Sequence, residues 1–413
     1  ITSTLKQAGY QTAIIGKGHI GVHWPRREFN YHRFDHMTDA LPDDPMSSDY
    51  FRSLVEAGMP DQFDLSSKYQ QHPECAITSP LPLEHSVEVW CGNETVQYLR
   101  QRDRGKPFFA CISFSRPHDP LTVPEPFDRM YNPEEVTVPA NAEDTFEGKS
   151  ERQQQAKRGE LSYPFRPRDR AHLQKCIAHY YGLVSLIDEQ IGRILEELES
   201  EGILEETIVI YSADHGDFAG EHGLIWKNLG FYECIHRVPL ILRYPAGLPQ
   251  GEVFDAFVES VDLYPTLTNL LGIDAPNTVQ GRSLVPALQG KETWNKQAAL
   301  CEHVKGYHHM SMRTEDFRIT VDITGDESEL YDHRTDPGEL TNRWDDPDYR
   351  EIREKLLIDL LRYRSCPPLL HGPLPPGLRP SAVPGYESES WSQAHHDIHR
   401  GVPWSEIVVR GDG

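Results

Sequence analysis

A long amphipathic segment followed by a short apolar run is the feature that most restricts the fold. Between residues 170 and 200, apolar residues recur every three or four positions, which predicts a helix with one buried face. The residues of that face are Leu173, Ile177, Tyr180, Val184, Ile187, Ile191, Ile194 and Leu198. Gly202 is a helix stop signal, and residues 207–212 (TIVIYS) then read as a buried strand. A helix that leads into such a strand is typical of a βαβ unit.

The same arrangement occurs nearer the N-terminus. Residues 86–100 predict a second helix, and the apolar run 107–114 (PFFACISF) follows it as a strand. Residues 12–15 and 238–243 are two further strand candidates. Because strands that are buried on both faces are apolar throughout, these runs indicate a mostly parallel central sheet in a three-layer α/β/α sandwich.

Sequence texture divides the chain into three expected parts. Residues 1–290 carry the alternating helices and strands, and we expect them to form a catalytic domain. Residues 291–364 are expected to form a small α+β subdomain with an antiparallel sheet. Its predicted elements are strands near 311–313, 317–323 and 329–331 and a helix over 349–363. Residues 365–413, rich in Pro and Gly, predict an irregular arm, and the polar stretch 141–170 predicts an exposed loop.

Charge and cysteine usage exclude several classes of protein. The 41 basic and 64 acidic residues give a formal net charge of −23, which argues against a nucleic-acid partner. A small anionic substrate stays compatible, because one lysine within 4 Å of it contributes up to about 4 kcal/mol at an effective dielectric near 20. The seven cysteines form no CxxC pair and so predict neither a zinc cluster nor a disulfide framework. The sequence contains no apolar run long enough to predict a membrane span.

Two short motifs at predicted strand ends supply candidate catalytic residues. The first, GKGH (residues 16–19), combines glycines that let a backbone approach an anion with the cation of Lys17, although its spacing is not that of a Walker A loop. The second, RPHDP (residues 116–120), presents His118 from a loop that two prolines stiffen, which suits a general acid. The alternatives are a tight turn with a surface lysine and a proline-rich turn with an incidental histidine.

Two further motifs lie near the end of the 207–212 strand. In DHGD (residues 214–217), the Asp214 carboxylate and the His215 imidazole are natural ligands of a divalent cation, whereas Asp217 could cap a turn. Since Ca²⁺ takes six to eight ligands, others must come from elsewhere. In GEHGLIWK (residues 220–227), Lys227 is either a functional cation or an ordinary solvated one. An HExxH motif is absent from the sequence, which excludes a zincin protease.

The order of these motifs resembles that of the sulfatase family, the formylglycine-dependent type I enzymes of the alkaline-phosphatase superfamily. Residues 9–19 (GYQTAIIGKGH) resemble the second sulfatase signature, with Gly18 in place of a bulky aromatic residue. Residues 108–120 are similar to the FFLxVSFxxPHxP segment of the family. Residues 207–239 are similar to its TxVIxTSDHGxxLGEHGLWxKxxxYExxxRVP block. The resemblance covers about residues 1–363.

The family likeness also implies what precedes Ile1. The nucleophile of the family is a formylglycine made from the cysteine of a CxPSR motif, and this motif does not occur in the 413 residues. That motif and a pair of metal-binding aspartates are therefore expected upstream. We expect the chain to be N-terminally truncated and unable to turn over substrate as it stands. The likeness favours a periplasmic or secreted protein.

The resemblance assigns roles to the candidate residues. Asp214 and His215 are expected to bind Ca²⁺, with Mg²⁺ as the alternative, and the metal to polarise a sulfate oxygen. Lys17 and Lys227 would offset the charge of the transferring group. His118 would protonate the leaving group, and His19 would lie beside the nucleophile.

Two other functions fit the same residues. One is a phosphonate monoester or phosphodiester hydrolase of the same superfamily, and the other is a non-catalytic, sulfatase-like binding protein. The predicted substrate is a small-molecule or carbohydrate sulfate ester, and its identity and the oligomeric state stay open.

Overall fold

The computed structural model describes most of the chain up to residue 365, which forms one compact unit. The described residues are 1–18, 28–35, 45–60, 74–161, 165–227, 229–276, 278–303, 309–323, 325 and 327–365. His19 and the expected C-terminal arm from residue 366 onward lie outside them.

A parallel three-stranded sheet follows α1 (Thr2–Gln7). Its central strand is β1 (Gln11–Gly16), which pairs in parallel with β2 (Tyr31–Phe34) on one side and with β4 (Phe108–Ser113) on the other. Every β1 residue after the first is buried, as the apolar run predicted. The predicted strand ends at residues 15 and 114 therefore come from adjacent strands that run in the same direction.

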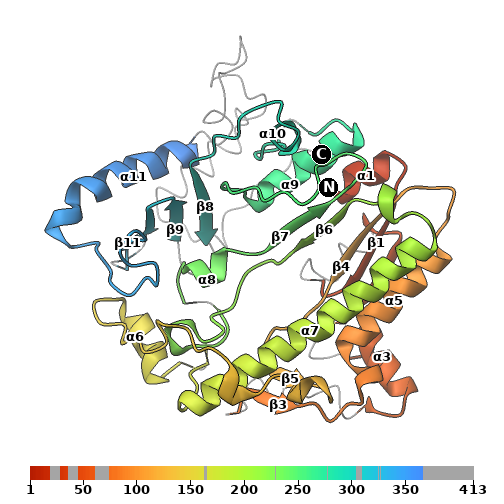
Figure 1. Cartoon of the computed structure of the whole chain (residues 1–413), viewed down its shortest axis with the longest axis horizontal. Coiled ribbons are helices and arrows are strands. Elements are labelled where there is room, and N and C mark those ends of the chain that lie inside the picture. Colours follow the sequence, from red (N-terminus) through yellow and green to blue (C-terminus); the bar gives the residue numbers. More distant parts are fainter. Residues whose placement is uncertain are drawn as a thin grey trace, which may run out of the picture. The chain divides into compact units, whose positions relative to one another are not determined.

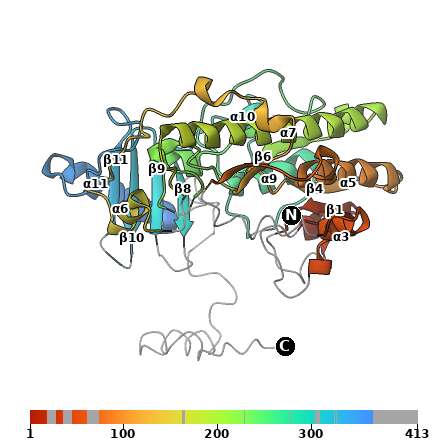
Figure 2. The same ribbon diagram turned by 90° about the horizontal axis from the view of Figure 1, so that it is seen from below.

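Two long helices pack together on one face of this sheet. The helix α5 (Val87–Gln101) begins at Ser86, whose side chain accepts the N–H of Val89, and α7 (Arg170–Ser200) begins at Asp169, which accepts the N–H of His172. The two helices lie side by side (Figures 1 and 2). Their apolar faces share one core with β1 and with α3 (Asp49–Glu56). Members of that core are Ala13, Ile15, Tyr50, Leu54, Trp90, Cys91, Tyr98, Leu99 and Leu198.

Two strand pairs complete the α/β part. The short strands β3 (Ala76–Thr78) and β5 (Leu121–Val123) pair in parallel and pack on the first half of α7. The strands β6 (Val209–Ser212) and β7 (Leu240–Arg243) pair antiparallel. The expectation that these two apolar runs belong to a parallel arrangement is therefore wrong. The connecting residues 213–239 contain only the single-turn α8 (Glu233–His236) and a 3₁₀ turn, and not the longer helix that usually forms a parallel crossover.

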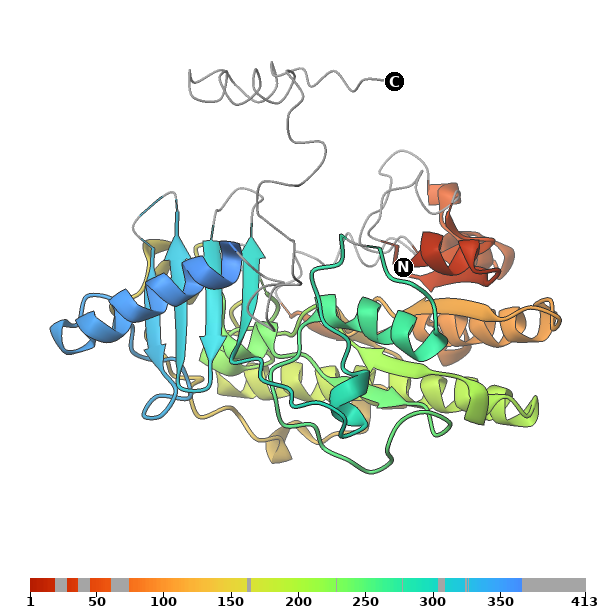
Figure 3. The same ribbon diagram turned by 90° about the horizontal axis from the view of Figure 1, so that it is seen from above.

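The remaining elements form a second sheet and the two helices that precede it. After α9 (Ser260–Leu271) and α10 (Val285–Leu288), four antiparallel strands follow: β8 (Ala298–His303), β9 (His309–Thr314), β10 (Phe317–Asp322) and β11 (Glu329–Asp332). Figure 3 shows α11 (Arg350–Ser365) lying across this sheet, and its Leu356 and Leu360 share a core with Met312, Ile319 and Leu330. The parallel sheet and the separate antiparallel sheet confirm the predicted α/β fold class. The strand β8 was not predicted.

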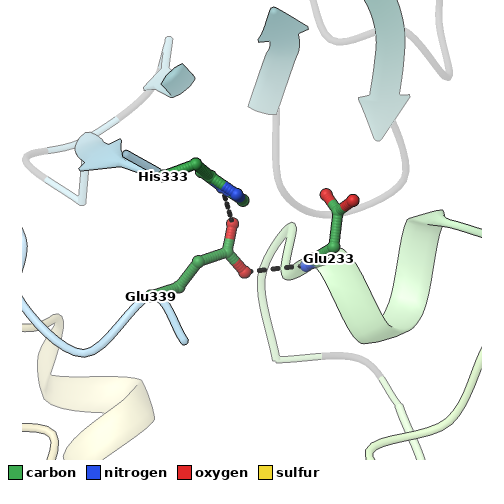
Figure 4. A group of neighbouring side chains, drawn as sticks. All are labelled: Glu233, His333 and Glu339. Atoms are coloured by element: carbon green, nitrogen blue, oxygen red, sulfur yellow. Dashed lines mark hydrogen bonds and ion pairs between the residues drawn. The ribbon is translucent and has the colours of Figure 1, made fainter. Parts of the chain in front are cut away.

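A buried ion-pair network joins the antiparallel sheet to α8. Arg318 of β10 is 2% exposed, and its guanidinium contacts the carboxylates of both Glu339 and Glu233. Figure 4 shows that Glu339 also accepts a hydrogen bond from the backbone N–H of Glu233 (2.7 Å) and lies 3.0 Å from His333 Nε2. The pKa of Glu339 is lowered to about 2, because Arg318 and His333 outweigh the effect of burial. The two parts of the unit are thus joined by charge as well as by apolar contact.

The prediction of an exposed loop over 141–170 is wrong. This stretch contains α6 (Glu151–Arg158), which begins with a capping box between Ser150 and Gln153. Lys149 is buried, with its ammonium 2.8 Å from Asp144 Oδ2 and 4.9 Å from the centres of the Phe146 and Tyr232 rings. Polar composition misled the prediction because these charges pair inside the protein instead of facing solvent.

Asp144→Ala is expected to destabilise the fold by about 3–5 kcal/mol, because it leaves Lys149 buried without its counter-ion. Urea unfolding followed by circular dichroism measures the change. Glu354→Ala, which removes the exposed helical pair with Arg350, is the control and should change stability by less than about 0.5 kcal/mol. Contacts with His222 and Lys149 outweigh burial and lower the pKa of Asp144 from 3.8 to about 2. Its contribution is therefore complete above pH 3.8 and is lost as the pH falls through about 2.

Candidate active site

Three loops carry the predicted catalytic and metal-binding residues. Lys17 directly follows β1, and its backbone N–H donates to Ser113 O at the end of β4 (2.8 Å). A side chain at Gly16 would lie 2.0 Å from the same carbonyl oxygen, and the φ of Gly16 is +98°, so only glycine allows this approach. His118 comes from the loop after β4, and Asp214 follows the end of β6. Strand ends therefore position all three.

The structure brings four of the predicted residues into one polar cluster. Lys17 Nζ lies 3.7 Å from Asp214 Oδ2, and Asp214 Oδ1 lies 3.6 Å from His215 Nε2. Lys227 Nζ lies 2.6 Å from the same His215 nitrogen. Because His215 Nδ1 donates to Gly216 O (2.7 Å), Nε2 carries the lone pair and accepts from Lys227. Residues more than two hundred positions apart thus meet here.

Electrostatics in this cluster favour a bound anion. Burial raises the pKa of Asp214, but the neighbouring His215, Lys17 and Lys227 outweigh it and lower that pKa overall. Burial, and then the charge of Lys17, lower the pKa of Lys227. The Asp214 side chain is 68% exposed, whereas that of Lys17 is 10% exposed. Asp119 and Asp217 also act on Lys227, but burial raises the pKa of both carboxyls, so Asp214 is the main counter-charge of the two ammonium groups.

His118 is held on both ring nitrogens. Nδ1 donates to the carbonyl oxygen of Asp119 (2.7 Å), and Nε2 accepts from the indole N–H of Trp226 (3.3 Å). Burial, together with the charges of Lys227, Lys17 and Arg116, lowers the pKa of His118 to about 3. The imidazole is therefore neutral at pH 7 in the free protein. A bound anion that offsets those cations would raise this pKa and allow the ring to carry a proton.

Several neighbours have a structural part in the site. The guanidinium of Arg116 donates to the carbonyl oxygen of His118 (2.6 Å) and so shapes the loop. The carboxylate of Asp217 accepts the backbone N–H groups of Ala219 (2.8 Å) and Trp226 (2.9 Å), as a turn cap does. His222 is buried and lies 2.7 Å from Asp144 through Nδ1, which gives it a structural contact away from the cluster.

Trp226 is the residue that sequence reasoning missed. The sequence predicts only that it belongs to the loop that carries Lys227, which it directly precedes. Its one signal in the sequence was its place directly before Lys227. The related family block has its tryptophan one residue earlier, where this chain has the buried Ile225, so the likeness of the motif did not point to Trp226.

The donor set at Asp214 and His215 fits a divalent cation in part. The Asp214 carboxylate and His215 Nε2, 3.6 Å apart, can share one ion once Lys227 releases the Nε2 lone pair that it occupies here, and further oxygen ligands are needed for Ca²⁺. A second group of potential ligands, Glu233, His333 and Glu339, lies where α8 begins (Figure 4). The guanidinium of Arg318 already compensates both of these carboxylates, so this group serves as an ion-pair network.

Comparison with known proteins identifies the family. A family model described as "Sulfatase" matches residues 1–273, more than half of the sequence. The chain belongs to the sulfatase family. A second model, described as the C-terminal part of N-sulphoglucosamine sulphohydrolase, matches residues 220–365. This agrees with the resemblance of the motifs and with the alkaline-phosphatase superfamily.

Individual relatives extend over most of this sulfatase. An arylsulfatase of Clostridium perfringens is 29% identical over 385 residues, 88% of this chain and 78% of that protein. An N-acetylglucosamine-6-O-sulfatase of Bacteroides thetaiotaomicron is 28% identical, over 86% of this chain and 70% of that protein. The crystal structure of a phosphonate monoester hydrolase of Agrobacterium radiobacter matches with a TM-score of 0.71 at 23% identity, over 89% of this chain and 80% of that one. The last likeness supports the fold alone.

The family model and the sequence relatives show that the protein is a sulfuric ester hydrolase, as the motifs predicted. Among the residues that the structure describes, no helix is both long enough and apolar enough to cross a membrane.

Proposed function

We propose that this sulfatase cleaves a sulfate monoester at the cluster of Lys17, Asp214, His215 and Lys227, with His118 as the general acid. The observation that carries the proposal is the convergence of both lysines on the Asp214–His215 pair, at 3.7 Å and 2.6 Å. An ester sulfate is a compact anion, and this is the described region where two cations, a carboxylate and a lone-pair imidazole meet at strand ends.

The residues of this chain bind and orient the group that is transferred. Lys17 and Lys227 would each donate to sulfate oxygens, and a cation within 4 Å contributes up to about 4 kcal/mol at an effective dielectric near 20. The sulfate charge would in turn raise the pKa of His118, so that its Nε2 can donate a proton to the ester oxygen as the leaving group departs.

A divalent cation would be held by Asp214 and His215 together with ligands from elsewhere. When bound, it would act as a Lewis acid on a sulfate oxygen. We propose Ca²⁺, with Mg²⁺ as the alternative, because carboxylate-rich sites suit these hard cations. For the nucleophile, we propose the formylglycine of the sulfatase family, whose CxPSR motif does not occur in the 413 residues.

For the substrate, we propose a sulfated carbohydrate. The support is the relative named N-acetylglucosamine-6-O-sulfatase, whose similarity extends over 86% of this chain. The open Asp214 side chain leaves the cluster accessible to a ring-sized alcohol.

A paired-substrate assay tests the reaction. The full product of the coding sequence, with any residues upstream of Ile1, is assayed on 4-nitrophenyl sulfate, glucosamine 6-sulfate and bis(4-nitrophenyl) phosphate. We expect kcat/KM for the sulfates to exceed that for the diester by about 100-fold or more, which corresponds to about 2.7 kcal/mol in transition-state binding. A comparable excess on the diester would instead support the phosphodiester hydrolase, and a lack of turnover on all three would support the binding protein.

A further inference from the structure

His118 carries a hydrogen bond on each of its ring nitrogens in this structure. The Nδ1–H is used by the carbonyl oxygen of Asp119 at 2.7 Å, which fixes the neutral tautomer whose lone pair lies on Nε2. That lone pair accepts from Trp226 Nε1 at 3.3 Å, and the two rings meet edge to face with centres 6.0 Å apart. Nε2 is the atom from which a general acid would donate, and Trp226 occupies it.

The backbone of Trp226 is held in an unusual conformation. Its φ is +85°, in the left-handed region that large side chains rarely adopt. Two hydrogen bonds hold it there: Asp217 Oδ1 accepts the Trp226 N–H (2.9 Å), and Trp226 O accepts the Phe218 N–H (2.9 Å). The carboxylate of Asp217 is buried, and burial raises its pKa. These two hydrogen bonds therefore fix the backbone of Trp226, and this backbone directs the indole N–H at His118.

We propose that Trp226 is a positioning residue for His118: its indole N–H holds the ring in one orientation and occupies Nε2 until the leaving group of the substrate takes its place. This inference rests on the proposed function, since it assigns a partner to the proposed general acid. It also goes beyond that function, because it assigns a role to a residue to which the proposed reaction gives none.

The chemistry of the exchange follows from the hydrogen-bond inventory of imidazole. Nε2 can accept from the indole or carry a proton, but not both, so the Trp226 bond stabilises the neutral ring and breaks when His118 is protonated. The charged groups that face the ring are Lys17, Lys227 and Arg116, which also disfavour its protonation, and the carboxyl of Asp119. When a sulfate ester enters and offsets the charge of the two lysines, the ring takes up a proton from solvent at Nε2, the Trp226 bond breaks, and the ester oxygen accepts from Nε2–H. Removal of the indole alone should therefore make His118 more basic.

Nuclear magnetic resonance of the histidine ring nitrogens in the 413-residue chain tests this without turnover. In the unaltered protein, the Nε2 resonance of His118 should be that of a hydrogen-bonded imine, and the Trp226 indole proton should exchange slowly with solvent. In Trp226→Phe, the Nε2 resonance should move to the position of a free imine, and the midpoint of the His118 titration should rise. The matched control is Trp294→Phe, which removes an indole N–H bonded to Phe257 O (2.8 Å) and should leave His118 unchanged.

Two results would overturn the proposal. One is an unaltered protein in which His118 Nε2 is a free imine or carries the proton, a measurement that needs no variant to fold. The other is a folded Trp226→Phe variant in which both the Nε2 resonance and the titration of His118 are unchanged.

Kinetics on the full coding product separate this inference from the proposed function. If both hold, Trp226→Phe lowers kcat about tenfold, changes KM less than twofold and shifts the basic limb of the pH profile to higher pH, because His118 must be protonated to act as the acid. If the NMR result holds but the unaltered enzyme hydrolyses no sulfate ester, the contact is real and the proposed function fails.

Discussion

Replacement of His118 by alanine is expected to lower kcat for a sugar sulfate by about 10²–10⁴-fold, the usual contribution of a general acid. An alkyl alkoxide is a poor leaving group, and His118 lies in the loop after β4 with its ring held by hydrogen bonds to Asp119 and Trp226. The effect should shrink strongly for 4-nitrophenyl sulfate, because nitrophenolate departs without protonation. Steady-state kinetics of His118→Ala on both substrates measure the ratio.

The leaving-group dependence is the internal control of this experiment. A variant that had merely lost its fold would lose both activities together, and its thermal midpoint would fall. Equal losses on the sugar and the nitrophenyl substrates, in a variant with an unchanged midpoint, would contradict the assignment of His118 as the acid.

Replacement of Lys227 by alanine should lower kcat/KM by about 10²–10³-fold, as does the loss of one preorganised group that stabilises transition-state charge. Lys227 Nζ lies 2.6 Å from His215 Nε2, within the cluster where the sulfate is proposed to bind. Kinetics on a sugar sulfate measure the loss, and isothermal calorimetry with inorganic sulfate should show weaker binding.

Lys291→Ala is the matched control for Lys227→Ala, because Lys291 is an exposed cation far along the chain from the four motifs. It should leave both kinetics and sulfate binding unchanged. A Lys227→Ala variant with full activity would place the transferred group elsewhere and would remove the main support for the proposed site.

Much of the fold could be predicted because the signals were local. The helix expected over residues 170–200 has those bounds in the structure, and the helix expected over 86–100 runs from Val87 to Gln101. Side-chain periodicity and a capping residue determine such elements within a few turns of chain. Strand pairing is different, since β6 and β7 pair antiparallel although their apolar composition is that of buried parallel strands. A strand's composition reports its burial and not the direction of its neighbour.

The stretch around Lys149 shows a second limit. Charged residues there predicted a solvated loop, yet Lys149 is buried against Asp144 and aromatic rings that lie about eighty residues or more away in sequence. A charge is buried when a partner is present, and the partner is decided by the fold.

The sequence by itself determined the residue types of the site, the order of its motifs and the family, because these depend on chemistry written along the chain. The tertiary structure showed why Gly16 is needed, since only glycine permits β1 to end against Ser113 O. Only the tertiary structure decided that Lys17, Asp214, His215 and Lys227 meet, that His118 is neutral, and that Trp226 holds it. The reason is that distance, burial and hydrogen-bond partners arise from chain segments brought together by folding, and these set the charge and orientation of each side chain.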